Sequence, residues 1–315
     1  EWYLSNLQPD GSVVYKFWPE ANRYANENNI VRHALSTWNL VQAYGVDPRP
    51  EFLEAAKATL SFTEKHRVEE SNPDHGRMAY YRYKDNVKLG TVVIGILGII
   101  DLAKATKSTE YDELLVKLGN FTTFMSQKDG NFLGYHVPKG HPYHGRTNDI
   151  VPGEAALALV GLAEYFDDDR WLKPLDKYWA YYMPLFRERA ATKRADAPWP
   201  WFTYDNEMRL ALVQMGPWTV MAANAYHRRT GNKDVAVFGL EVARWMIDTY
   251  QWTTDRAPWP DYVGGYFKLR EELPAMQAFC YAEGTAAAYQ LAIRAAPEQV
   301  SYFERSTREA MRLGL

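Results

Sequence analysis

One kind of segment recurs along this chain, and its recurrence limits the possible folds more than any other feature. Five stretches are rich in small and apolar residues and poor in charge, and they begin near residues 29, 88, 151, 210 and 277. Their apolar residues occur almost all round a helical wheel, which is typical of a helix enclosed by other elements. The spacing of about 60 residues predicts a repeating helical unit.

A second predicted helix of different character follows each of these inner helices. Residues 51–66 (EFLEAAKATLSFTEKH) carry apolar side chains at helical spacing beside charged ones, which predicts a half-exposed outer helix. The same order recurs in four more outer helices, at 110–127, 170–190, 234–250 and 298–313. Residues 1–8 read as the tail of a further outer helix, so a sixth inner helix would precede Glu1.

Long segments rich in Gly, Pro and aromatic residues connect each outer helix to the next inner helix. They cover residues 10–28, 72–84, 129–148, 195–205 and 254–269. Helix pairs with long loops always on the same side predict an α/α toroid or a helical solenoid. A solenoid would leave one polar face on its inner helices, and these have none. We therefore predict an all-α fold, a closed α/α toroid of five to six pairs with aromatic-rich loops at one end, as a single domain over residues 1–315.

Charge and composition exclude several classes of function. The net charge of -3 and the pI of about 6.2 give no basic excess for a nucleic-acid partner. No apolar run reaches the roughly 18 residues of a membrane span, because the nearest, 92–100, ends at Asp101. Cys280 is the only cysteine, which excludes an internal disulfide and a cysteine-based zinc site.

Three inner helices carry an ionisable residue at the same position when they are aligned by their C-terminal ends. These residues are His33, Glu154 and Glu283, and each is expected in the first turn of its helix. In a toroid, equivalent positions face one central axis, so the three side chains would share a cavity at the loop end. The alternative is that the two acids only complement the helix dipole, which contributes about 0.3 to 1 kcal/mol.

Two carboxylates in a shared cleft suit the acid and base roles of glycoside hydrolysis. Our catalytic candidates are therefore Glu154 and Glu283, together with His33 and Asp149. His33 is an acid, a base or a core histidine, and Asp149 is alternatively a helix N-cap. Polar residues at neighbouring junctions of loop and helix suit the binding of sugar hydroxyls or of a substrate carboxylate: Arg32, Lys88, Asn148 and Gln214.

Aromatic residues make up 15% of the chain, and many lie in the connecting segments instead of the helices. Sugar rings stack on Trp and Tyr, and neighbouring prolines stiffen the backbone that holds these rings. The candidates for substrate contact in these segments are Tyr83, His141, Tyr143, His144, Trp199, Trp201, Tyr204, Trp259 and Tyr262. The alternative is that they cover one end of the barrel and pack on each other. His141 and His144 lack a third metal ligand at a suitable spacing, so we predict neither a metal nor a cofactor.

The segments VRHALSTW, VPGEAALALVGLAEY and CYAEGTAAAYQLA resemble those of the α/α-toroid superfamily of carbohydrate-active proteins, the six-hairpin-glycosidase type. Within it, the chain resembles glucuronyl C5-epimerase-like and acylglucosamine-epimerase-like domains as well as toroid hydrolases and lyases. This resemblance implies a carbohydrate substrate, often without a metal. Together with the pair Glu154 and Glu283, it favours a glycoside hydrolase acting on a poly- or oligosaccharide, in the periplasm or outside the cell.

Two alternatives stay open. One is a sugar epimerase or polysaccharide lyase in which His33 or a tyrosine is the base and Arg32 or Lys88 holds a uronate carboxylate. The other is a glycan-binding toroid without catalytic activity, in which the two glutamates only cap helices.

Overall fold

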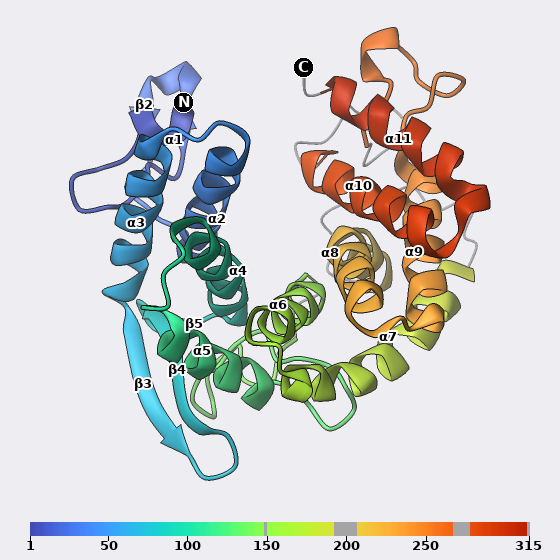
Figure 1. Ribbon diagram of the computed structural model, residues 1–315. Helices are drawn as coiled ribbons and strands as arrows, with labels where there is room; N and C mark the ends of the chain where they lie inside the picture. The colour runs from blue at the N-terminus through green and yellow to red at the C-terminus, as the bar shows by residue number, and fades with distance from the viewer. Residues whose placement is uncertain (148–149, 192–206, 267–277, 314–315) are drawn as a thin grey trace. The chain divides into compact units, whose positions relative to one another are not determined.

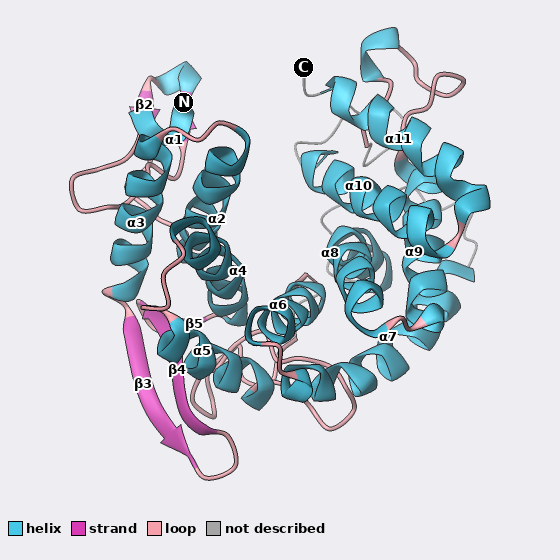
Figure 2. Ribbon diagram, in the orientation of Figure 1, coloured by secondary structure: helices cyan, strands magenta, loops and turns pink. Residues whose placement is uncertain are grey.

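The computed structural model describes residues 1–147, 150–191, 207–266 and 278–313 (Figure 1). These ranges form eleven α-helices, and their strands belong to two small antiparallel sheets (Figure 2). The contacts of the chain cluster into two compact units. The first unit comprises Glu1–Lys128, Phe132–Asn148 and Gly161–Pro174, and the second comprises Asp129–Asn131, Asp149–Val160 and Leu175–Leu315. The single domain over residues 1–315 stays a prediction.

Helices of the first unit alternate between inner and outer, as the sequence predicts. The unit contains α1 (Trp2–Ser5), α2 (Ile30–Val46), α3 (Pro50–Glu64), α4 (Leu89–Thr106), α5 (Asp112–Phe124) and the C-terminal part of α6 (Val151–Phe166). Helix α2 packs against α3 and α4, and α4 packs against α5. Fourteen of the 18 residues of α4 are buried, so this helix is enclosed on nearly all sides. By contrast, α3 buries a single stripe formed by Phe52, Ala55, Ala56, Thr59, Leu60 and Thr63.

Small residues let the inner helices of this unit approach closely. A β-carbon at Gly98 of α4 would lie 3.2 Å from the backbone nitrogen of Trp38 in α2. The Trp38 indole N–H also donates to the Asp101 carboxylate over 2.7 Å. Asp101, which interrupts the apolar run in the sequence, thus ties α4 to α2.

Helix α4 has the length and the apolar composition of a membrane-crossing helix, with a mean hydropathy of 1.7. However, 78% of it is buried inside the protein, and a helix buried in this way is typical of a globular core. Among the described residues, no other helix meets the same criteria.

The connection that the sequence predicts as a loop over 72–84 is a β-hairpin. Strands β3 (Arg67–Asn72) and β4 (Gly76–Tyr83) pair in antiparallel register, and β5 (Asn86–Val87) pairs with the end of β4. The Asn72 side chain accepts from the backbone N–H groups of Asp74 and His75, which forms the turn, and Gly76 takes the positive φ of 71° that follows. Four consecutive residues, Met78 to Tyr81, are buried, and the strand packs on α5.

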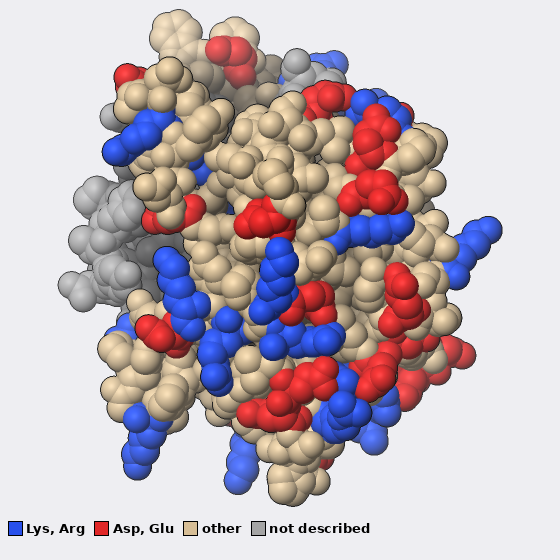
Figure 3. Space-filling model, turned by 90° about the vertical axis from the view of Figure 1, so that its left-hand side faces the viewer, with Lys and Arg blue, Asp and Glu red and all other residues tan. Residues whose placement is uncertain are grey.

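A second, smaller ribbon joins β1 (Phe17–Trp18) and β2 (Arg23–Tyr24). The face of the first unit that carries α3 and the β3–β4 hairpin mixes positive and negative side chains without a large area of one sign (Figure 3). On it, Lys117 lies 2.8 Å from both Glu69 and Glu113. This face therefore carries no basic patch for a nucleic acid.

The second unit repeats the alternation of inner and outer helices. It contains the N-terminal part of α6, α7 (Lys173–Ala191, from Leu175), α8 (Glu207–Thr230), α9 (Lys233–Tyr250), α10 (Ala278–Ala295) and α11 (Val300–Leu313). Helix α8 packs against α9 and α10, and α10 packs against α11. The buried residues of α11 form one stripe at helical spacing, comprising Phe303, Ser306, Thr307 and Ala310. The outer character predicted for this helix is confirmed.

Candidate functional site

The three aligned ionisable residues lie near the start of their helices. His33 and Glu154 are each the fourth residue, in α2 and α6. Glu283 is the sixth residue of α10 and lies in the second turn, so its predicted first-turn position is wrong. His33 belongs to the first unit, whereas both glutamates belong to the second.

His33 is enclosed by its own unit. Its side chain is 2% exposed, and its ring stacks on Phe62 with the ring centroids 4.4 Å apart. The ring nitrogen Nδ1 lies 3.4 Å from the hydroxyl of Thr63. Burial lowers the pKa of His33 to about 4, so the imidazole is neutral at neutral pH. This environment agrees with the alternative in which His33 is a histidine of the hydrophobic core.

A row of aromatic rings continues from His33 within the first unit. Phe62 contacts His66 at 5.3 Å between centroids, and His66 contacts Tyr83 at 5.0 Å. Tyr83, a candidate for substrate contact, is thereby connected to His33 through two rings. His66 was not among the predicted site residues, because it follows the outer helix α3 and is outside the inner-helix alignment.

Both glutamates lie beside glycines that press against the same turn of α8. A β-carbon at Gly153, the residue before Glu154, would lie 2.7 Å from the Trp218 Cβ. A β-carbon at Gly284, the residue after Glu283, would lie 2.8 Å from the Cα of Pro217. Trp218 and Pro217 are neighbours in sequence, so these two contacts and the covalent bonds between them link the Cα atoms of Gly153 and Gly284. The length of this path limits the distance between the two Cα atoms to roughly 14 Å. The backbones that carry Glu154 and Glu283 therefore both contact the same turn of α8.

The two glutamates differ in their environment. Glu154 is 5% exposed, whereas Glu283 is solvent-exposed. Protein atoms around the Glu283 carboxyl nevertheless displace enough water to raise its pKa by desolvation. A carboxyl that is reachable by solvent and yet holds its proton more strongly than usual is suited to donate it.

The loop between α9 and α10 carries two further candidates. Its base is closed by paired hydrogen bonds, in which Trp252 N–H donates to the Gly265 carbonyl and Gly264 N–H donates to the Trp252 carbonyl, both over 2.7 Å. Between these ends, Trp259 is 62% exposed and Tyr262 is half-buried. Trp259 is thus available for stacking on a ligand.

The loop before α6 holds its aromatic candidates against each other. Tyr143 stacks on Tyr135 with centroids 4.6 Å apart, and His141 lies 5.5 Å from Tyr143. The His144 Nδ1 lies 3.1 Å from the Val137 carbonyl oxygen, so this ring is tied to the loop backbone. Part of this loop therefore matches the alternative in which the aromatic residues pack on each other. The Tyr143 side chain nevertheless stays 39% exposed.

The remaining candidates are dispersed. Arg32 is exposed on α2, and Lys88 is the residue before α4, in a backbone bridge with Tyr135. Gln214 lies in α8, but its side chain is outside the described part of the chain. Five further candidates lie outside the described residues altogether: Asn148, Asp149, Trp199, Trp201 and Tyr204.

Several aromatic residues of the connecting segments belong to the core, contrary to our expectation of a role outside it. Tyr80, Tyr81 and Tyr266 are at most 1% exposed, and Tyr266 stacks on Tyr281 of α10 at 4.8 Å. Their position in segments rich in Gly and Pro suggested surface loops, but pairing and packing enclose them. Within the described ranges, no three His, Cys, Asp or Glu side chains form a group suited to a metal.

No protein-family profile and no curated protein sequence matches the chain. Its structure is similar to a D-mannose isomerase, with 12% identity over 99% of this chain and 82% of that protein and a TM-score of 0.66. It is also similar to the GH76A α-1,6-mannanase of Salegentibacter sp. HEL1_6, with 16% identity, coverages of 96% and 81%, and a TM-score of 0.65.

A third similar structure is the cellobiose 2-epimerase of Bacillus thermoamylovorans B4167, with 8% identity, coverages of 98% and 82%, and a TM-score of 0.64. At these identities the likeness establishes the fold. The chain therefore has an all-α fold, an α/α toroid, as its sequence predicts.

Proposed function

We propose that the protein is a carbohydrate-active enzyme, and specifically a glycoside hydrolase that uses Glu154 and Glu283 as its pair of carboxylates. The observation that carries the proposal is the convergence of Gly153 and Gly284 on one turn of α8. This convergence holds the backbone of two acidic residues in a fixed relation, as acid and base catalysis of glycosidic cleavage requires.

In this proposal, Glu283 donates a proton to the leaving oxygen of the glycosidic bond. Desolvation raises the pKa of its carboxyl, which keeps the proton in place at a higher pH than for an ordinary glutamate. Glu154 then takes the role of the carboxylate on the other side of the sugar, as nucleophile or as base for a water molecule. The exposed Trp259 of the same unit supplies a ring for stacking on a sugar.

The similar structures agree with a carbohydrate substrate, since they include a mannose isomerase, mannanases, cellobiose epimerases and a glucuronyl hydrolase. They include both hydrolases and isomerising enzymes, and so the choice between these reactions rests on the two glutamates.

The test is the release of reducing ends from a panel of polysaccharides by the wild type, Glu154→Gln and Glu283→Gln. Each variant should lose about 10²- to 10⁴-fold in kcat, whereas Glu54→Gln on the outer helix α3 should behave like the wild type. Full turnover by both site variants would rule out the paired-carboxylate mechanism.

A second candidate function is the isomerisation or epimerisation of a sugar. It is favoured by the likeness of the fold to a D-mannose isomerase and a cellobiose 2-epimerase, and His33, whose imidazole is neutral at neutral pH, is the base to test. Incubation of mono- and disaccharides in deuterated water distinguishes it from hydrolysis. Deuterium incorporated at carbon without cleavage, and lost in His33→Asn, would favour this candidate over the hydrolase.

A further inference from the structure

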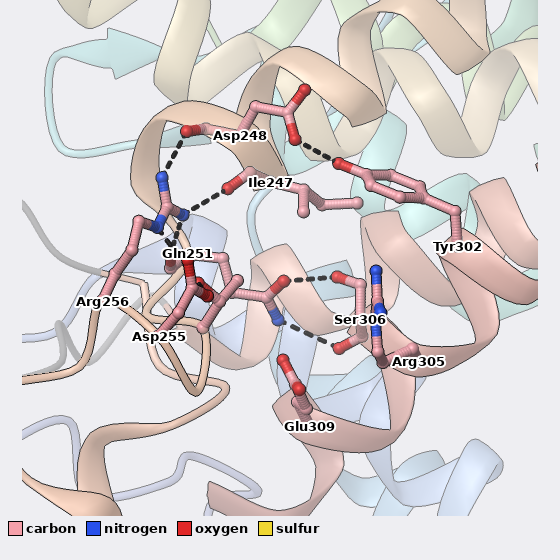
Figure 4. A pocket seen from close by; sticks show the side chains of 10 residues that line it. Ile247, Asp248, Gln251, Asp255, Arg256, Tyr302, Arg305, Ser306 and Glu309 are labelled. Atoms are coloured by element: carbon pink, nitrogen blue, oxygen red, sulfur yellow. Dashed lines mark hydrogen bonds between the residues drawn. The ribbon is translucent and has the colours of Figure 1, made fainter.

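A polar hollow of about 250 Å³ lies in the second unit (Figure 4). Neither Glu154 nor Glu283 is among the residues that line it. It lies between the C-terminal end of α9, the segment that follows this helix, and α11. Its charged lining comprises Asp248, Asp255, Arg256, Arg305 and Glu309. A space of this size suits a single sugar ring better than a larger ligand.

The back wall of the hollow is fixed by a buried amide. Gln251 is fully buried, and its side-chain nitrogen donates to the carbonyls of Ser306 over 2.9 Å and Gly264 over 3.4 Å. In return, the Ser306 hydroxyl donates to the Gln251 side-chain oxygen (Figure 4). Because each group on this wall already has its partner, a ligand would bind without rearranging it.

Arg256 is committed to the fold. Its guanidinium donates to the backbone carbonyls of Asp248 over 2.5 Å and Ile247 over 2.9 Å, and also to that of Gln251. Its Nε donates to the Thr253 hydroxyl over 3.1 Å. These carbonyls lie at the end of α9, where a helix has no further partners of its own. Arg256 therefore caps α9 and leaves few donors for a ligand.

Arg305 differs, because in the described part of the chain its guanidinium forms neither an ion pair nor a hydrogen bond. Two carboxylates of the hollow also keep acceptor positions. Asp255 accepts from the Thr253 hydroxyl over 2.6 Å, and Glu309 accepts from the Thr254 hydroxyl over 3.4 Å. The groups left for a ligand are thus one cationic donor and two carboxylates.

The balance of these groups selects the chemistry of the ligand. Three carboxylates against two guanidinium groups disfavour an anion, and the acids do not form a group suited to a metal within the described residues. A hydroxyl both donates and accepts hydrogen bonds, so neighbouring hydroxyls can satisfy the carboxylates and Arg305 together. We propose that this hollow is a second binding site, for one neutral sugar unit, distinct from the catalytic pair Glu154 and Glu283.

The test is calorimetric titration of the folded protein with the methyl glycosides of glucose, galactose and mannose. At least one should bind saturably, and Asp255→Asn or Arg305→Gln should weaken its binding roughly tenfold, as expected for loss of a hydrogen bond to a charged group. Arg308→Gln is the matched control, because Arg308 lies on the same helix but pairs with Glu304 outside the hollow. Its binding should equal that of the wild type.

Three results would overturn the proposal. The first is no saturable binding of any of the three glycosides, and the second is binding by the Asp255 and Arg305 variants as tight as by the wild type. The third is tighter binding of glucuronate or glycine than of the glycosides. The double variant Glu154→Gln, Glu283→Gln should keep the binding. Sugar binding at the hollow is thus measured independently of turnover, so failure of the proposed catalytic function would leave this test intact.

Discussion

Gly284 and Pro217 meet backbone to backbone: a β-carbon at position 284 would lie 2.8 Å from the Cα of Pro217. Real Cβ atoms do not approach other atoms so closely, and neither helix backbone can move as a flexible side chain would. Gly284 therefore fixes how near α10 comes to α8. Since Glu283 is its neighbour in sequence, this contact also sets the position of the proposed proton donor.

We expect Gly284→Ala to destabilise the protein by about 1 to 3 kcal/mol, because the added methyl overpacks a contact between two backbones. The measurement is the free energy of unfolding in urea. The control is Gly45→Ala in α2, where an added Cβ meets nothing within 4 Å. That variant should be as stable as the wild type or slightly more stable, because alanine favours the helix.

Glu283→Gln should stabilise the fold at neutral pH while it reduces turnover. Desolvation raises the pKa of Glu283 in the folded state, so the folded protein favours the protonated form. The corresponding stability is present at acid pH and is lost as the pH rises through the folded pKa. Thermal melts of both proteins between pH 4 and pH 8 should differ most at the upper end. Equal melting temperatures throughout would contradict the desolvation of this carboxyl.

His33 should make the fold less stable at acid pH, whereas Glu283 makes it less stable at higher pH. Its folded pKa of about 4 lies below the ordinary histidine pKa of 6.5, so the unfolded chain binds a proton first. Stability is then lost as the pH falls from 6.5 towards 4, by about 3 kcal/mol at most. Urea unfolding of His33→Phe should show a weaker loss over this range, whereas His227→Gln should keep the wild-type pH dependence.

The inner and outer helices were predictable because their patterns follow from burial. A segment such as α4, apolar on all sides, has no stable place except inside other helices, and the stripe of α3 requires one covered face. The β3–β4 hairpin was not predictable in this way. Its residues Met78 to Tyr81 are buried one after another, so they lack the alternation that indicates a half-exposed strand.

The candidate site was predictable only in part. The register of the repeat predicts Glu154 and Glu283 at equivalent positions, whereas the structure has Glu154 in the first turn of α6 and Glu283 in the second turn of α10. The burial of His33, Tyr81 and Tyr266 depends on which residues face them across the fold. That information is in the tertiary packing and is absent from the local sequence. The hollow beside Arg305 was missed for the same reason, because its residues come from α9, a loop and α11.

Asn29 caps α2, and the strength of this cap can be measured. Its side-chain oxygen accepts from the backbone N–H groups of Val31 over 3.1 Å and Arg32 over 3.3 Å. Asn29→Ala should lower the free energy of unfolding by about 1 kcal/mol, because both N–H groups lose their protein partner. Asn26→Ala is the control, since Asn26 lies exposed in the preceding loop and caps no helix. If the two variants were equally stable, the cap would contribute nothing to the stability of the fold.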